Sequence, residues 1–184
     1  GVLWTPEVRA SKTAEEWIRR MQSACFSPMA MINAWADGTK PWTFPEVADA
    51  VKDVANLRMQ LLPYLYTTFA AYHREGKPPF RAMQLVDGFV SQNIQERGQF
   101  DATQNPYQMA TRKDIKDQYM MGDAILVAPM FAGEKTRNVI LPKGKWYDFY
   151  TGAFVGDGQV ITVTPGLDRI PVYVKDGGII PLMP

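Results

Sequence analysis

The chain has 184 residues, of which 46% are hydrophobic, so it is able to bury a substantial core and is not of the disordered class. Twenty basic and nineteen acidic residues leave a net charge of +1, which gives no reason to expect nucleic acid or a membrane surface as partner. The single cysteine and single histidine exclude an internal disulfide and a histidine-cluster metal site, and no stretch approaches the roughly 20 apolar residues of a membrane span.

The first predicted element is a helix that follows Thr13. Thr13 has the side chain of an N-cap, and Glu16 three residues later completes the spacing of a capping box. Apolar residues then recur on one face at helical spacing: Trp17, Ile18, Met21 and Ala24 or Cys25. We interpret Cys25 in this apolar setting as a buried structural thiol rather than a nucleophile.

The next stretch, residues 26–35, has the sequence FSPMAMINAW and is predicted to be a short buried strand after the helix break at Pro28. Residues 43–76 then predict a long helix, with Pro45 in its first turn and Gly76 at its end. Pro63 in its interior predicts a kink or break near Leu62. Helix, buried strand and helix in this order are typical of an α/β barrel or a doubly wound sheet.

After Lys77 the pattern changes to short β-rich runs separated by Gly, Pro and Asp-Gly breaks: PPFRAMQL, AILVAPMF, RNVILPK, KWYDFYT, QVITVTPG, IPVYVKDG and GIIPLM. This pattern predicts an antiparallel β-sandwich over residues 77–184. Residues 88–116 are polar and weakly periodic, and we expect a surface excursion there. The boundary with the helical part, residues 1–76, is expected at Gly76 to Pro79. Both ends of the chain are abrupt, so we expect a truncated piece of a larger protein.

Five segments, in this order along the chain, carry a family resemblance: EEWIRRMQSACFSP, LRMQLLPYLYT, DQYMMGDAILVAP, LPKGKWYDFYTG and LDRIPVYVKDGGIIPL. Through these five segments the chain resembles the glycoside hydrolases of family 31, the α-glucosidase and α-xylosidase family. The resemblance implies that residues 1–76 are the end of a (β/α)8 TIM barrel, with the exit of strand seven, strand eight and helix eight. Residues 77–184 would be the proximal β-sandwich behind it.

The resemblance also implies a retaining α-glycosidase, whose two carboxyl groups stand about 5 Å apart across the bond that is cleaved. In the family these are aspartates on earlier barrel strands, so no residue of this chain is expected to be catalytic. The implied partners are a carbohydrate substrate and the remaining N-terminal part of the same enzyme. No metal or organic cofactor is implied.

The implied contribution of this chain is to the sugar subsite. Where most members place Arg-Asn-His or Arg-Ser-His on strand eight, this chain aligns Met31 with the arginine and Asn33 with the sugar-binding histidine. Trp35 is a candidate for stacking on a sugar face. Where many members have Asp-Ile-Gly-Gly-Phe, this chain instead offers Trp4 and Glu7.

Alternatives stay open for these residues and for the function. Instead of binding a sugar, Asn33 could be a buried amide that forms hydrogen bonds with loop backbone groups. Instead of stacking on a sugar, Trp35 could close the barrel mouth. An amide has a shorter reach than imidazole and is never cationic, which favours a changed hydroxyl pattern and hence an α-galactosidase. The alternatives are an α-glucosidase, an α-xylosidase, or a non-catalytic carbohydrate-binding or structural module. Arg58, in an apolar helix, predicts a buried ion pair or a cap on backbone carbonyls.

Overall fold

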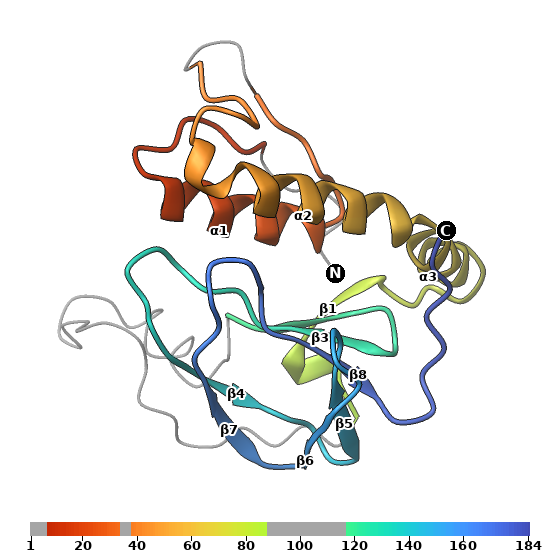
Figure 1. The fold of residues 1–184 in the computed structure, drawn as a ribbon. Coiled ribbons are helices and arrows are strands. Elements are labelled where there is room, and N and C mark those ends of the chain that lie inside the picture. Colours follow the sequence, from red (N-terminus) through yellow and green to blue (C-terminus); the bar gives the residue numbers. More distant parts are fainter. Residues whose placement is uncertain (1–6, 34–37, 88–116) are drawn as a thin grey trace, which may run out of the picture.

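The computed structural model describes residues 7–33, 38–87 and 117–184. Three helices lie on one side of a six-stranded antiparallel sheet, and a two-stranded sheet lies on its other side (Figure 1). The helical segments are α1 (Ala14–Cys25), the short 3-10 helix η1 (Pro45–Val47), α2 (Ala48–Gln60) and α3 (Leu62–Glu75). Within the described residues, no helix is both long enough and apolar enough to cross a bilayer.

Helix α1 begins as its sequence predicts. The Thr13 hydroxyl oxygen accepts a hydrogen bond from the backbone N–H of Glu16, at 3.2 Å. The Glu16 carboxylate accepts from the backbone N–H of Lys12 at 2.8 Å, one residue before the usual partner in a capping box. The predicted apolar face is confirmed, because Trp17, Ile18, Met21 and Cys25 are all buried.

The long helix predicted over residues 43–76 is divided at Leu61, which confirms the predicted break. Pro63 stands in the first turn of α3, where its missing N–H costs nothing, whereas inside one continuous helix its ring would clash with the preceding turn. Gly76 ends α3 in the left-handed conformation, with φ of +71°, and its N–H donates to the Tyr72 carbonyl at 2.9 Å.

The buried strand predicted after α1 is wrong in extent and burial. Of residues 26–33, only Ile32 makes a bridge, parallel to Val8, and Met31 is 37% exposed. The carbonyls of residues 26–28 accept hydrogen bonds from the side chains of Arg58 and Tyr119 in place of a neighbouring strand. A parallel bridge is what neighbouring barrel strands would form, but the described residues show no barrel beyond it.

The second half of the described chain is built from short antiparallel strands. The six-stranded sheet has the order β1-β2-β3-β8-β5-β6, and β4 pairs with β7 in a sheet of two. The strand bounds are β1 (Phe80–Ala82), β2 (Tyr119–Met121), β3 (Ile125–Val127), β4 (Arg137–Ile140), β5 (Lys145–Asp148), β6 (Phe154–Asp157), β7 (Val160–Val163) and β8 (Val172–Lys175). A short 3-10 helix, η2 (Met83–Leu85), follows β1.

This antiparallel pairing agrees with the predicted sandwich. The final run, GIIPLM, is not a strand: Ile179 is 85% exposed, and the Met183 N–H donates to the Gln60 carbonyl of α2 at 2.8 Å. The β2 and β6 strands were not predicted. The expected surface excursion at 88–116 lies outside the described residues.

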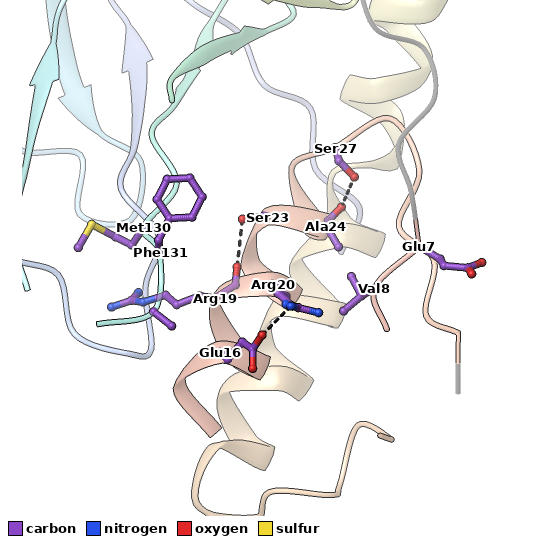
Figure 2. Close-up of a pocket in the computed structure, with 11 residues that line it drawn as sticks. Glu7, Val8, Glu16, Arg19, Arg20, Ser23, Ala24, Ser27, Met130 and Phe131 are labelled. Atoms are coloured by element: carbon purple, nitrogen blue, oxygen red, sulfur yellow. Dashed lines mark hydrogen bonds and ion pairs between the residues drawn. The ribbon is translucent and has the colours of Figure 1, made fainter. Parts of the chain in front are cut away.

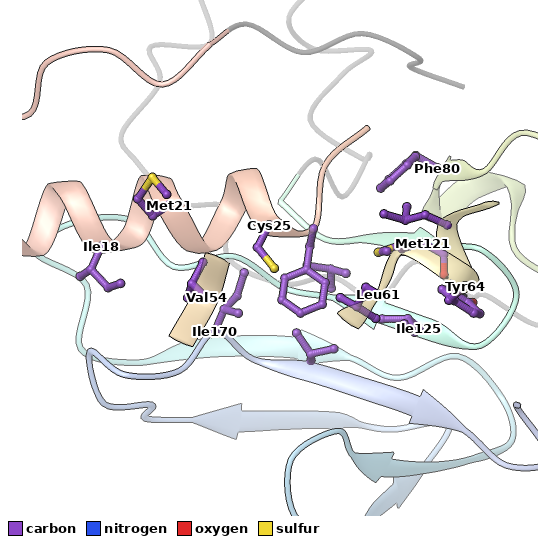
Figure 3. Close-up of a cluster of buried hydrophobic side chains, with 14 of the residues drawn as sticks. Ile18, Met21, Cys25, Val54, Leu61, Tyr64, Phe80, Met121, Ile125 and Ile170 are labelled. Carbon is purple, nitrogen blue, oxygen red and sulfur yellow. Dashed lines mark hydrogen bonds between the residues drawn. The ribbon is translucent and has the colours of Figure 1, made fainter. Parts of the chain in front are cut away.

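Two hydrophobic cores lie on the two faces of the six-stranded sheet, because side chains alternate along each strand. Val172 belongs to the core under the helices, and Tyr173 beside it belongs to the core against β4 and β7. Figure 3 shows the first core, where side chains of α1, α2 and α3 meet those of β1, β2 and β3. This core crosses the boundary expected at Gly76, so the division into 1–76 and 77–184 stays a prediction.

Candidate functional site

The parallel bridge places two of the predicted site residues beside each other. The Val8 N–H donates to the Met31 carbonyl at 2.8 Å, and the Asn33 N–H donates to the Val8 carbonyl at 2.9 Å. The two extended segments are therefore held in register, and the Asn33 side-chain Nδ2 donates to Glu7 Oε1 at 2.7 Å. Residues 26 positions apart in the chain thus form one polar pair.

Arg9 completes this cluster. Its Nε and Nη2 lie 3.0 Å and 2.7 Å from the same Glu7 oxygen that accepts from Asn33. Arg9 was not predicted, although positions 7 and 9 of an extended segment share a face and the alternation could have indicated it. The Arg9 side chain is 64% exposed, so this ion pair contributes little to stability.

The electrostatics of the cluster suit binding rather than proton transfer. The hydrogen bond from Asn33, and after it the one from Arg9, lower the pKa of Glu7 below its ordinary value of 4.5. Glu7 is therefore ionised at neutral pH and accepts hydrogen bonds. A general acid needs the opposite shift, toward the working pH.

Trp4 and Trp35, the two aromatic residues predicted to shape the site, lie outside the described residues. Their roles stay predictions. Asn33 is half-buried and Glu7 is 23% exposed at its side chain, so the pair is within reach of a solute.

A groove of about 520 Å³ runs along α1 beside the cluster. Figure 2 shows Glu7 and Val8 at one end and Met130 and Phe131 at the other. Its second carboxylate, that of Glu16, is paired with Arg20 at 2.5 Å, and Glu7 points away from α1 (Figure 2). The two carboxylates do not face each other across the groove, so it is not a glycosidase centre.

No group of three or more His, Cys, Asp or Glu side chains in the described parts of the chain is arranged to hold a metal ion. Two roles were predicted for Arg58, an ion pair or a cap on backbone carbonyls. The structure confirms the second, because Arg58 donates to the carbonyls of Cys25, Ser27 and Pro28. Tyr119, which binds the Phe26 carbonyl in the same turn, had no signal in the sequence that set it apart from a core tyrosine.

Comparison with known families places both halves of the chain. Residues 4–68 match the model of the TIM-barrel domain of glycosyl hydrolases family 31, and residues 101–180 match that of the family's C-terminal domain. The chain belongs to glycoside hydrolase family 31. The resemblance drawn from the five sequence segments is thereby confirmed.

Several named proteins are similar to this chain. An isomaltosyltransferase of Sporosarcina globispora is 30% identical over 92% of this chain and 15% of its own length. An α-glucosidase 2 of Bacillus thermoamyloliquefaciens is 31% identical, over 89% of this chain and 19% of its own. An α-xylosidase of Saccharolobus solfataricus is 30% identical over 97% of this chain and 22% of its own length.

A solved family 31 structure has the same fold. The dextranase of Flavobacterium johnsoniae, as a mutant complexed with isomaltotriose, matches 93% of this chain and 19% of its own, with a TM-score of 0.73 and 31% identity. This chain therefore spans about a fifth or less of the length of most of the proteins named here.

Proposed function

We propose that this chain is part of a retaining family 31 glycosidase that acts on α-linked glucose or xylose units. The observation that carries the proposal is the ionised Glu7 held by Asn33, in a segment that matches the family's barrel domain. The two segments that carry the pair are adjacent and parallel, and barrel enzymes bind substrate at the ends of such strands.

In this site Glu7 accepts hydrogen bonds from sugar hydroxyls, and Asn33 fixes the carboxylate in place. A hydrogen bond to a charged group contributes about 1.5–3 kcal/mol, and leaving one partner of such a bond unpaired costs more than that. The pair thus supplies orientation and affinity. The bond is broken by two aspartates that we expect on earlier barrel strands, outside this chain.

The substrate preference inferred from Asn33 alone is corrected here. From Asn33 we expected an α-galactosidase. The relatives described above are instead named for isomaltosyl groups, α-glucosides, α-xylosides and dextran. The α-glucosidase or α-xylosidase alternative fits them better. The physical reason is that Asn33 does not act alone: its amide N–H is directed at Glu7, so its identity does not by itself specify the hydroxyl pattern of the sugar.

Transfer of the sugar to another sugar is the second candidate, because the isomaltosyltransferase aligns with 92% of this chain. Hydrolysis and transfer share a glycosyl-enzyme intermediate and differ only in whether water or a sugar hydroxyl attacks it. Product analysis at high substrate concentration separates the two, since transfer yields oligosaccharides longer than the substrate.

The test uses the intact parent enzyme with nitrophenyl α-glucoside, α-xyloside and α-galactoside. We expect the largest kcat/KM on the glucoside or the xyloside; a largest value on the galactoside would overturn the proposed substrate. Glu7→Gln and Asn33→Ala should each raise KM by about tenfold with a smaller change in kcat. Glu46→Gln, at an exposed carboxylate in η1, is the matched control and should leave both constants unchanged.

A further inference from the structure

The turn between α1 and the Asn33 segment is held by side chains from two distant parts of the chain. Four consecutive carbonyls, those of residues 25–28, each accept a hydrogen bond from outside the turn. Arg58 Nη1 donates to Cys25 O at 2.8 Å and to Ser27 O, and its Nη2 donates to Pro28 O at 3.1 Å. The Tyr119 hydroxyl donates to Phe26 O at 2.6 Å.

These two donors approach from different elements. Arg58 lies in α2, whereas Tyr119 is the first residue of β2, 93 positions away from the carbonyl it binds. The Tyr119 ring packs on Phe80 of β1, with centroids 6.2 Å apart, so its direction is fixed by the sheet. Burial lowers the pKa of Arg58 and raises that of Tyr119, so the tyrosine hydroxyl stays protonated and able to donate throughout the neutral range.

The turn at residues 25–28 ends only five residues before Asn33, the site residue that it precedes in the chain. From Pro28 the chain runs to Met31 and Asn33, whose backbone groups bind Val8. The segment is therefore fixed at its start by Arg58 and Tyr119 and at its end by Val8. A shift of the turn would be carried along this extended backbone to the Asn33 amide, and binding groups must be held within about 0.5 Å of their working geometry.

We propose that Arg58 and Tyr119 are positioning residues for the Asn33–Glu7 pair, and that through Tyr119 the C-terminal sheet takes part in building the sugar site. This inference rests on the proposed function of that pair. It assigns to the sheet a role in substrate affinity in addition to its role in covering the helices.

The test is Tyr119→Phe in the intact enzyme. This change keeps the ring and removes one hydroxyl, so Phe26 O loses its donor. We expect KM for the preferred nitrophenyl glycoside to rise about fivefold, the equivalent of one ordinary hydrogen bond, with kcat changed less than twofold. An unchanged KM would overturn the proposal.

Tyr64→Phe is the matched control, because Tyr64 is also buried and also joins a helix to the sheet. Its hydroxyl donates to the Met121 carbonyl at 2.8 Å and accepts from the Ala124 N–H at 3.0 Å, and neither of these bonds involves the turn at residues 25–28. Tyr64→Phe should lower the unfolding temperature and leave KM unchanged. Equal rises of KM in both variants would mean a general loss of stability and would contradict a positioning role.

A double variant shows whether Tyr119 acts through Asn33. In the Asn33→Ala background, Tyr119→Phe should add no further rise in KM, since the group it positions is gone. A full fivefold rise in that background would overturn the proposal. If Asn33→Ala alone leaves KM unchanged, both the proposed function and the positioning role are wrong. If Asn33→Ala raises KM but Tyr119→Phe does not, only the positioning role is wrong.

Discussion

Gly122 lies so close to the Tyr64 hydroxyl that a Cβ added to the glycine would be 2.3 Å from that oxygen. The same hydroxyl binds the backbone on both sides of Gly122, at Met121 and Ala124. Helix α3 is thereby joined to the turn between β2 and β3. The absence of a side chain at Gly122 is what allows this close approach.

Gly122→Ala should accordingly destabilise the protein strongly. The φ of +62° costs an L-residue about 1–2 kcal/mol, and overpacking against Tyr64 and the Thr68 methyl, 2.5 Å away, adds about 1–3 kcal/mol. The measurement is the urea midpoint of unfolding.

Gly76→Ala serves as the control for that prediction. Gly76 has a φ of +71°, but no atom lies within 4 Å of an added Cβ, so only the backbone cost of about 1–2 kcal/mol applies. Equal losses in the two variants would show that the contact with Tyr64 carries no packing cost.

The acid limb of the activity profile should depend on Asn33. In the wild type, the hydrogen bond from the Asn33 side-chain Nδ2 stabilises ionised Glu7 and keeps its pKa below 4.5, so Glu7 stays charged until the pH falls below that lowered value. Asn33→Ala removes the largest cause of the shift, and the pKa should rise. The measurement is kcat/KM against pH, whose acid limb should move to higher pH in the variant.

Asn33→Asp should move that limb further than Asn33→Ala. In the wild type, Glu7 Oε1 accepts a hydrogen bond from Asn33 Nδ2 at 2.7 Å, and the variant places a second carboxylate there instead. Two adjacent carboxylates repel each other when both are ionised, so the pKa of Glu7 should rise further. A profile that does not move in either variant would show that Glu7 does not contribute to binding.

Local signals predicted the helices, whereas the strand after α1 was decided by distant residues. Thr13, Pro63 and Gly76 act through their own turn of the backbone, so the start of α1, the break at Leu61 and the end of α3 were readable from the sequence. Residues 26–32 are apolar enough for a buried strand. Their conformation is instead fixed by Arg58 and Tyr119, which no local pattern connects to that turn.

The candidate site was predictable in part for the same reason. The family register proposed Asn33 and Glu7 as candidates, and the structure brings the two side by side through Val8. The direct bond between them, and the part taken by Arg9, depend on how two segments align side by side. The sugar preference was therefore not readable from Asn33 alone.

Neither residues 1–76 nor residues 77–184 should fold as a separate product. Trp17, Ile18 and Leu61 on the helical side share one core with Ile125 and other strand residues, and a cut at Gly76 would expose both faces to water. Each piece expressed alone should aggregate. A monomeric, soluble 77–184 product would instead confirm the two-domain division, and a soluble sugar-binding 184-residue chain would favour a binding module.

The Cys25 thiol should be unreactive in the folded protein. It is 2% exposed, and burial raises its pKa to about 12 from an ordinary 9.0, so almost no thiolate forms at neutral pH. Unfolding exposes the group and restores its ordinary pKa. Its contribution to stability is thus present below pH 9 and declines above it, as the unfolded chain ionises first.

Ellman's reagent at pH 8 checks this directly. No reaction is expected with native protein over minutes, and one equivalent per chain is expected from this thiol after denaturation in guanidinium chloride. Cys25→Ser in the same protein is the control that assigns the signal to this thiol. Rapid labelling of the native protein would mean that α1 separates from the sheet often enough to expose its buried face, and would contradict a rigid support for the turn at residues 25–28.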